Sequence, residues 1–205
     1  MKDKMNDTQA ENSFDLARLA DLFFEAGLLR RVQRSGYAFL GSGNENVAEH
    51  SWRTAVIGYA LGRMAHADAS RVALLCLFHD LHEVRTGDFN YVNHRYDSCD
   101  ARRALEDAVQ DSGLDADILG MWDELEGESL EARLARDADQ LDLLCNLSVE
   151  LYRGNQFARE WIDSLLQRLR EPISRELAEQ ILRTDPNAWW FERVPREWWV
   201  NRGKK

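Results

Sequence analysis

The stretch RVALLCLFHDLHE (71–83) joins an apolar helix to a group of polar side chains. Residues 71–78 are apolar nearly all round, and a helix without a polar face is typical of a protein core. His79 and Asp80 follow directly, at a place where an ionisable group has to be paired, neutralised or bound to a metal. An imidazole and a carboxylate that are adjacent in sequence can bind one cation, and this mixed set suits Zn, Mn, Co or Fe(II). Glu83 is expected one turn further along the same helix face.

The rest of the chain also indicates helices. Apolar residues recur at helical spacing, and no segment shows the sustained alternation of a half-buried strand. The first of three prolines is Pro172, so the preceding 171 residues lack the strongest helix breaker. The pattern predicts helices at 14–30, 46–66, 70–84, 99–112, 115–126, 129–153, 156–170 and 173–183. The predicted fold is one compact all-α domain.

Composition divides the chain into three parts. Residues 1–13 form a polar N-terminal segment, and residues 14–185 form the predicted helical core. Residues 186–205, PNAWWFERVPREWWVNRGKK, contain four tryptophans. Tryptophans clustered beside prolines are typical of a tail that packs on the core or on a partner subunit.

Charge and hydropathy exclude several classes of protein. A net charge of -10 disfavours broad attraction to a nucleic acid polymer. The same charge repels a small phosphorylated substrate unless a cation or an arginine reverses it locally. No apolar run is long enough for a membrane span, and the first residues lack a signal sequence. The three cysteines include no CxxC pair, which fits a reducing compartment, so we expect a cytoplasmic protein.

Two further candidate ligands lie on other apolar helices. His50 falls on the apolar stripe of its helix, where a histidine is more often a structural core residue than a ligand. Asp139 lies on the second helix that is predicted to be buried, 130–151, and a buried aspartate needs a cation or several donors. The alternative for Asp139 is an ion pair with Arg136 or Arg133.

The candidate ligands follow a recognisable order along the chain. His50 precedes His79 by 29 residues (79 − 50), and Asp139 follows Asp80 by 59 (139 − 80). The order H…HD…D resembles the HD-domain superfamily, whose members hold a divalent metal on a helical scaffold. More closely, the chain is similar to the 5′-deoxynucleotidase group of that superfamily. Four stretches carry the resemblance: RVQRSGY (31–37), ENVAEHSWR (45–53), FHDLHEVRTGD (78–88) and RDADQLDLL (136–144).

The resemblance implies a role for individual residues. Glu83 and Asp88 would do catalytic work, and Arg34 would contact the phosphate. A homodimer is also implied. One divalent metal ion, such as Mn, Co, Fe, Zn or Mg, would be bound by His50, His79, Asp80 and Asp139.

The chain departs from that group at two positions near the expected site. The deoxynucleotidases have a tryptophan near the arginine that contacts the substrate, whereas this chain has Tyr37, which could stack on the base or the sugar. His82 stands where the group usually has a small residue, and it is a candidate substrate contact. An exposed or supporting histidine is the alternative. His94 and Arg95 either line the mouth of the site or belong to a plain loop.

These observations predict a metal-dependent phosphohydrolase with a small nucleotide substrate. The leading hypothesis is a 5′-nucleotidase that releases inorganic phosphate from (deoxy)ribonucleoside 5′-monophosphates. One alternative is a phosphodiesterase or a nucleotide triphosphohydrolase that uses the same metal. Another is a non-catalytic helical interaction module whose metal is structural.

Overall fold

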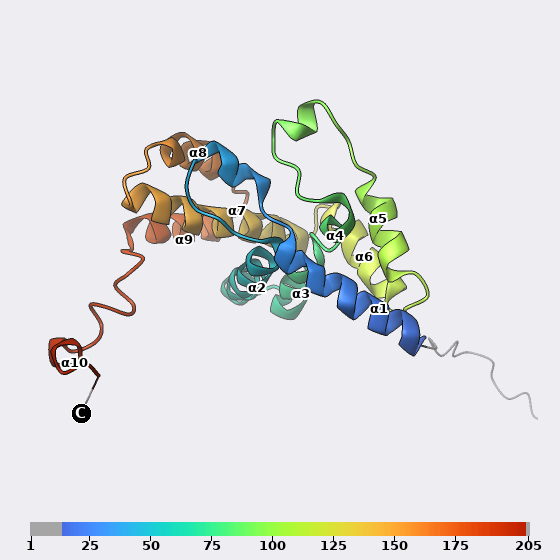
Figure 1. The fold of residues 1–205 in the computed structure, drawn as a ribbon, viewed down its shortest axis with the longest axis horizontal. Helices are drawn as coiled ribbons and strands as arrows, with labels where there is room; N and C mark the ends of the chain where they lie inside the picture. Colours follow the sequence, from blue (N-terminus) through green and yellow to red (C-terminus); the bar gives the residue numbers. More distant parts are fainter. Residues whose placement is uncertain (1–13, 204–205) are drawn as a thin grey trace, which may run out of the picture.

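The computed structural model describes residues 14–203, and every regular element in that range is a helix (Figure 1). The α-helices are α1 (Leu16–Ala26), α2 (Val47–Met64), α3 (Ala69–Phe78), α4 (Glu83–Thr86), α5 (Ala101–Val109), α6 (Asp115–Leu125), α7 (Leu130–Tyr152), α8 (Phe157–Leu166), α9 (Pro172–Arg183) and α10 (Arg196–Val200). Short 3-10 helices are η1 (Gly27–Arg31), η2 (Ser35–Phe39) and η3 (Asn93–Arg95). The described range contains no strand, only an isolated bridge between Gln33 and Asn46. The prediction of an all-α fold is confirmed.

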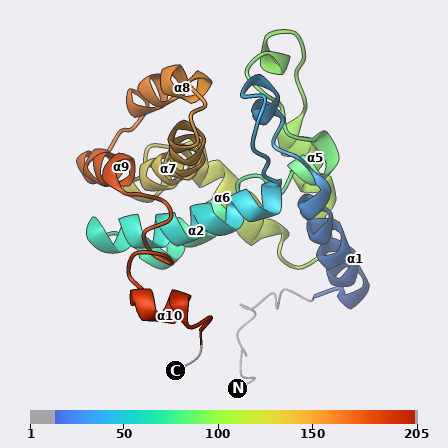
Figure 2. The same cartoon turned by 60° about the vertical axis from the view of Figure 1, so that its left-hand side comes forward.

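Helices α2, α3 and α7 pack against one another at the centre of the core. Leu61 of α2, Leu75 of α3 and Leu141 of α7 are fully buried there. Each such leucine contributes roughly 1.5–3 kcal/mol relative to an exposed one. Helices α8 and α9 flank α7, while α5 lies beside α1 on the other side of the molecule (Figure 2) and α6 packs against α3, α5 and α7. The helices that carry the candidate ligands are therefore the best-packed part of the fold.

Each of the three central helices begins at a side chain that caps its first turn. Asn46 caps α2 in a capping box, in which Asn46 Oδ1 accepts from the Glu49 N–H (3.0 Å) and Glu49 Oε2 accepts from the Asn46 N–H (3.3 Å). Asp68 caps α3, and Ser129 caps α7. A side-chain cap contributes about 1 kcal/mol and defines where the helix starts. These local signals determine where each of the three helices begins.

Glycine allows α2 and α3 to approach closely. An added Cβ at Gly62 would lie 2.6 Å from the Cα of Ala69, which is a backbone atom and cannot move aside as a flexible side chain would. At Gly58, an added Cβ would lie 2.5 Å from Cys76 Sγ. The distance between the helices that carry His50 and His79 therefore depends on both glycines.

Gly62→Ala is expected to lower the free energy of unfolding by about 1–3 kcal/mol, because the two helices must separate to admit the methyl group. The measurement is urea denaturation followed by circular dichroism. Gly120→Ala in α6 is the matched control, since nothing lies within 4 Å of a Cβ added there. That substitution is expected to raise stability by up to about 1 kcal/mol. Equal effects of the two substitutions would contradict this account of the helix contact.

The prediction of one continuous helix at 70–84 is wrong, because the helix is interrupted beside the candidate ligands. Helix α3 ends at Phe78, a turn spans residues 79–82, and α4 begins at Glu83. Hydrogen bonds of the tighter i→i−3 kind close the turn, from the Leu81 N–H to the Phe78 carbonyl (3.1 Å) and from the Glu83 N–H to the Asp80 carbonyl (3.0 Å). Leu81 remains buried, so the apolar periodicity continues through the break and conceals it. Glu83 therefore does not share a helix face with His79.

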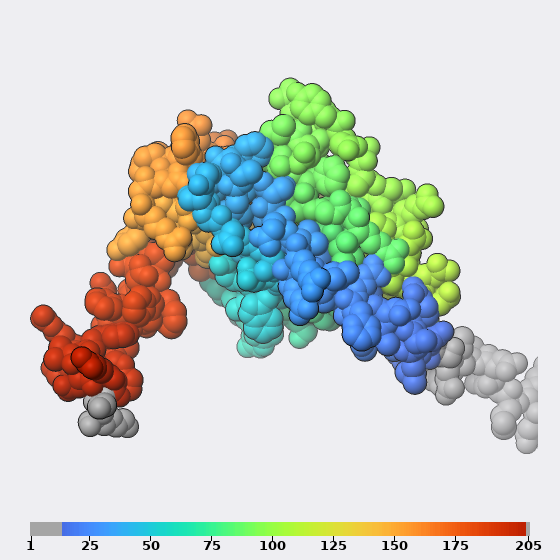
Figure 3. Space-filling view, in the orientation of Figure 1, coloured from blue at the N-terminus to red at the C-terminus, as the bar shows by residue number. Residues whose placement is uncertain are grey.

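The C-terminal aromatic residues contact one another. Helix α10 lies apart from the helical body (Figures 1 and 3). The ring centroids of Trp190 and Trp199 are 5.5 Å apart, as are those of Phe191 and Trp199. The division of the chain at residue 186, the packing of this tail on the core or a partner, the homodimer and the cytoplasmic location stay predictions. The polar segment 1–13 lies outside the described residues.

No helix in the described part of the chain combines the length and the apolar character that a membrane crossing requires.

Candidate metal centre and adjoining pocket

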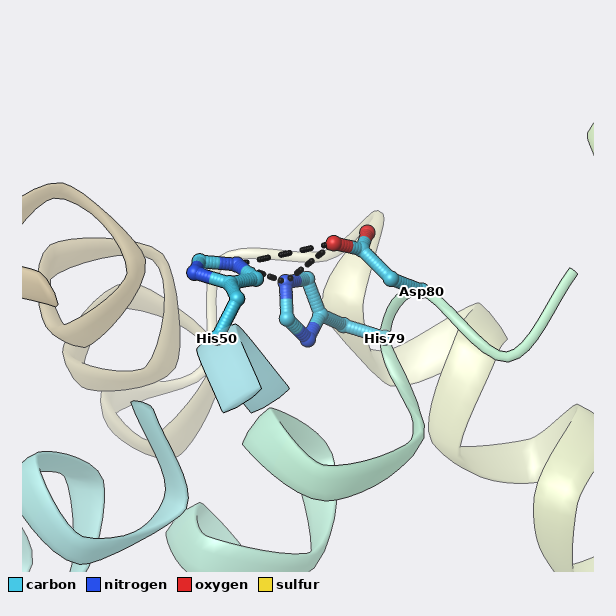
Figure 4. A group of neighbouring side chains, drawn as sticks. All are labelled: His50, His79 and Asp80. Atoms are coloured by element: carbon cyan, nitrogen blue, oxygen red, sulfur yellow. Dashed lines mark hydrogen bonds and ion pairs between the residues drawn. The ribbon is translucent and has the colours of Figure 1, made fainter. Parts of the chain in front are cut away.

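Three polar side chains, His50, His79 and Asp80, place one potential ligand atom each within 4.8 Å of one another, and Asp139 adjoins them through His50. His50 comes from α2, His79 and Asp80 from the turn after α3, and Asp139 from α7. His50 Nε2 lies 3.2 Å from His79 Nε2, 3.5 Å from Asp80 Oδ2 and 3.3 Å from Asp139 Oδ1. His79 Nε2 lies 3.0 Å from Asp80 Oδ2. Figure 4 shows both rings and the Asp80 carboxylate pointing toward one another.

Each imidazole is oriented by a hydrogen bond at its other nitrogen. His50 Nδ1 lies 2.7 Å from Asp142 Oδ2, and a carboxylate oxygen only accepts, so Nδ1 donates. His79 Nδ1 likewise donates to the Cys76 carbonyl at 2.7 Å. Both Nε2 lone pairs of the neutral rings therefore face each other across 3.2 Å, with two carboxylate oxygens beside them. A proton on one ring or a bound cation would relieve this repulsion of electron pairs, and a ring held by a hydrogen bond at its other nitrogen is typical of histidines that bind metals.

The charges at this point favour ionised carboxylates. Burial by itself would raise the pKa of Asp80, but the two histidines and Arg34 outweigh it and hold that pKa well below its usual range. Burial is likewise outweighed at Asp139, mainly by the hydrogen bond with His50, so the pKa of that carboxyl falls to about 2. Burial would lower the pKa of His50, but its bonds to Asp139 and Asp142 raise it to about 10. When no metal is bound, a proton on His50 Nε2 balances the negative charge of the carboxylates. A bound metal ion would replace that proton.

A pocket of about 210 Å³ opens beside these residues. His79, Asp80 and Asp139 form part of its wall, together with Arg34 and Glu83. Arg34 Nη1 lies 3.5 Å from Asp80 Oδ2, so a guanidinium faces the pocket next to the candidate ligands. Positive charge is thus available locally in a protein whose net charge is -10. Arg34 shares the pocket with the carboxylates of Asp80, Asp88 and Asp139, so a phosphorylated substrate would also require the charge of a bound cation.

Glu83 is the buried acid of the pocket. Its side chain is 8% exposed, and Oε2 has no hydrogen-bond partner among the described residues. Burial, together with the nearby carboxylates of Asp80 and Asp88, raises the pKa of Glu83 to about 9. A carboxyl group in this state can hold a proton at neutral pH. The spacing from His79 predicted that Glu83 lies near the candidate ligands. The turn at 79–82, which was not predicted, determines the position of Glu83 relative to them.

Asp88 and Tyr37 line the same pocket but are engaged with the protein. Asp88 Oδ2 accepts from the backbone N–H (2.5 Å) and the hydroxyl (2.6 Å) of Ser35, the residue after Arg34. The Tyr37 hydroxyl lies 3.4 Å from Glu45 Oε2 and donates to it. Asp88 therefore holds the segment that carries Arg34.

The structure does not bring His82 into this pocket. Its ring packs edge-on against Trp122 (5.2 Å between centroids) in a second hollow, on the α6 side of the candidate ligands. His94 does line the first pocket. Arg95 lies over the ring of Tyr96 instead (5.9 Å from the centroid).

The alternative ion pairs for Asp139 do not form. Arg133 pairs with Glu171 (2.6 Å). Arg136 donates to the carbonyls of α6 and of the turn that follows it. Asp139 Oδ2 accepts instead from Gln140 Nε2 at 2.9 Å, while Oδ1 remains directed at His50.

Sequence reasoning missed the residues that support His50. Asp142 is fully buried and bonds to His50, and Arg53 Nε in turn donates to Asp142 Oδ1 at 2.5 Å. Arg53 also donates to Glu45 Oε1 at 2.9 Å. Glu45, His50 and Asp142 form a second cluster of metal-binding residue types, but Arg53 already supplies its positive charge. The spacing along the helix could have identified Asp142, because it lies three residues after Asp139 on a buried helix and therefore on the same face.

The comparisons with known proteins identify the family. The model of the HD domain matches residues 26–181, so the chain belongs to the HD-domain family. It is 32% identical to the 5′-deoxynucleotidase YfbR of Escherichia coli (strain K12 / DH10B) over 126 residues, which cover 54% of this chain and 63% of that protein. The matched region thus spans less than two thirds of that relative.

Several solved structures share the fold, including the following two. One is described as a predicted metal-dependent phosphohydrolase from Magnetospirillum magnetotacticum MS-1, with a TM-score of 0.63, 26% identity, and coverage of 82% of this chain and 91% of that one. The other is the cyanophage S-2L HD phosphohydrolase DatZ, bound to dA and one catalytic Zn²⁺ ion, with a TM-score of 0.52, 17% identity, and coverage of 78% and 96%. The family and the neighbour from Magnetospirillum magnetotacticum together support a metal-dependent phosphohydrolase, whereas the likeness to DatZ shows the fold alone.

Proposed function

We propose that this chain is a 5′-nucleotidase, which releases inorganic phosphate from (deoxy)ribonucleoside 5′-monophosphates. One observation carries the proposal: the candidate ligands His79, Asp80 and Asp139 share a single pocket with a guanidinium and a buried carboxyl group, Arg34 and Glu83. A monoester phosphate needs both positive charge and a proton-transfer group, and this pocket offers them side by side. The likeness to YfbR supports the same substrate class.

His50, His79, Asp80 and Asp139 would hold one divalent metal ion. Their fit rests on the donor set, because His50, His79 and Asp80 bring two imidazoles and a carboxylate together and Asp139 adds a second carboxylate beside His50. When bound, the ion supplies a Lewis acid that polarises the phosphate and activates water. Mn, Co, Fe, Zn and Mg are all candidates, since nitrogen and oxygen ligands of this kind suit several divalent ions.

The remaining residues divide the work on the phosphate. Arg34 binds phosphate oxygens, because a guanidinium presents paired donors and keeps its charge. Glu83 moves the proton, since it lines the same pocket and its Oε2 has no hydrogen-bond partner among the described residues. Asp88 holds Ser35, and thereby the segment that carries Arg34. This is a positioning role, which differs from the catalytic role that the sequence resemblance implied.

The test is a panel of nucleoside 5′-mono-, di- and triphosphates and a cyclic dinucleotide, assayed with Mn, Co, Mg and Zn. We expect inorganic phosphate from monophosphates. Pyrophosphate, triphosphate or a released nucleotide as the main product would favour a triphosphohydrolase or a phosphodiesterase instead. Glu83→Gln is expected to keep its metal, because Glu83 is not a proposed ligand, and to lose about 100-fold or more in kcat. Absence of any hydrolysis by wild-type protein with a verified metal content would overturn the proposed function and favour an interaction module.

A further inference from the structure

The pocket beside the candidate ligands has a second, aromatic part. Trp161 of α8 and Tyr91 of the loop after α4 line it, together with Leu40 and Leu143. We call Trp161 and Tyr91 the aromatic wall. The mechanism proposed above uses neither residue, and no feature of the sequence marked them.

Trp161 packs against the short helix η2 through two of its residues. The ring centroids of Phe39 and Trp161 are 6.5 Å apart. An added Cβ at Gly36 would lie 3.3 Å from Trp161 Cη2, so the backbone of η2 lies against the edge of the indole. Gly36 follows Arg34 by two residues, so the segment that supplies the phosphate-binding guanidinium also supports the indole.

Tyr91 is held by α8 and the residues that follow it. The guanidinium carbon of Arg168 lies 4.8 Å from the centre of the Tyr91 ring, and Arg168 also donates to the Tyr91 hydroxyl. Tyr91 and Trp161 meet edge to face, with their centroids 6.5 Å apart and their planes at 85°. On the other side of the same loop, Asn90 donates to the Ser35 hydroxyl at 3.2 Å. The wall is therefore built into the fold before any ligand binds.

A flat, supported indole in a pocket that also binds phosphate suits a ligand with a planar ring. Stacking on an aromatic side chain contributes a large part of the binding of each nucleobase and accepts every base, because all bases present a π-face. A base-less sugar phosphate could use the polar part of the pocket but would leave the aromatic wall unused. Because the Asn90 amide is already engaged with Ser35, stacking is the main contact that the wall offers.

We propose that Trp161 stacks on the nucleobase, so that the site selects phosphomonoesters that carry a base and accepts different bases. This inference rests on the proposed function and deepens it. Trp161 would be a specificity-determining residue, and selection for the base would come from helix α8 rather than from the segment around Tyr37.

The test compares kcat/KM for deoxyadenosine 5′-monophosphate with kcat/KM for 2-deoxyribose 5-phosphate in the metal-loaded protein. Trp161→Leu is expected to lower the ratio of the two values by about tenfold or more. Trp161→Phe keeps an aromatic face and should lose less. The matched control is Trp52→Leu, because Trp52 is 69% exposed on α2 and lies outside this pocket. The ratio serves as an internal standard, since general damage to the fold lowers both values together.

An unchanged ratio in Trp161→Leu overturns the inference, and so does an equal loss in Trp52→Leu. Either outcome leaves the proposed function standing if the wild type hydrolyses the nucleotide. Failure of the wild type to hydrolyse any monophosphate overturns the proposed function instead. In that case, calorimetric titration with deoxyadenosine 5′-monophosphate still tests whether Trp161 stacks on the base. Weaker binding by Trp161→Leu than by Trp52→Leu supports stacking, and equal binding contradicts it.

Discussion

Asp80→Ala is expected to abolish phosphate release from nucleoside monophosphates. The loss in kcat/KM should be roughly a thousandfold or more, the scale seen when a group that acts in the transition state is removed. Asp80 Oδ2 lies within 3.5 Å of both His79 Nε2 and His50 Nε2, so its removal deletes one of the two carboxylates that balance a cation there. It also removes the partner of Arg34. Metal content, measured by elemental analysis of the dialysed protein, should fall together with activity.

Asp163→Ala is a suitable control for this experiment, because it removes an exposed aspartate on α8. The control should retain metal and activity, and a chelator should abolish its activity as it does in the wild type. A chelator-resistant wild type, or an Asp80→Ala protein that is fully active, would contradict the assignment of the metal centre. Loss of metal without loss of activity would show that the metal is structural.

Asp142→Ala is expected to weaken both the fold and the metal site. Asp142 is fully buried between His50 Nδ1 and Arg53 Nε, so its removal leaves two donors without an acceptor. Breaking a buried ion pair costs roughly 3–5 kcal/mol, and we expect the lower end because water can reach Arg53. The Arg53 side chain is 38% exposed. Metal affinity should fall about 10–100-fold, because His50 loses the bond that orients its ring.

Urea denaturation measures the first effect, and competition with a chromogenic chelator measures the second. Asp142→Asn is the matched variant, since its amide oxygen can still accept from His50 while the charge is lost. It should retain more metal affinity than Asp142→Ala. If both variants bound metal as tightly as the wild type, Asp142 would have only a structural role.

The sequence predicted the fold class and the types of chemical group at the site. Helical periodicity is a local property, and so are the caps at Asn46, Asp68 and Ser129 that begin the three central helices. The placement of His79 and Asp80 after an apolar helix was also readable, because an ionisable group in a core needs a partner. The roles of the nine predicted site residues come from resemblance and chemistry, and they stay proposals.

The tertiary structure decided where those groups meet. The break between α3 and α4 was hidden, because Leu81 continues the apolar pattern through the turn. Asp142 and Trp161 were not recognised, since their importance depends on contacts with residues that lie 92 and 125 positions earlier (142 − 50 and 161 − 36). His50 taken alone looked like an ordinary core histidine, and only the family resemblance marked it as a candidate ligand. Periodicity reports which face of a helix is buried, whereas the approach of the candidate ligands depends on the distance between helices, which Gly58 and Gly62 allow to be short.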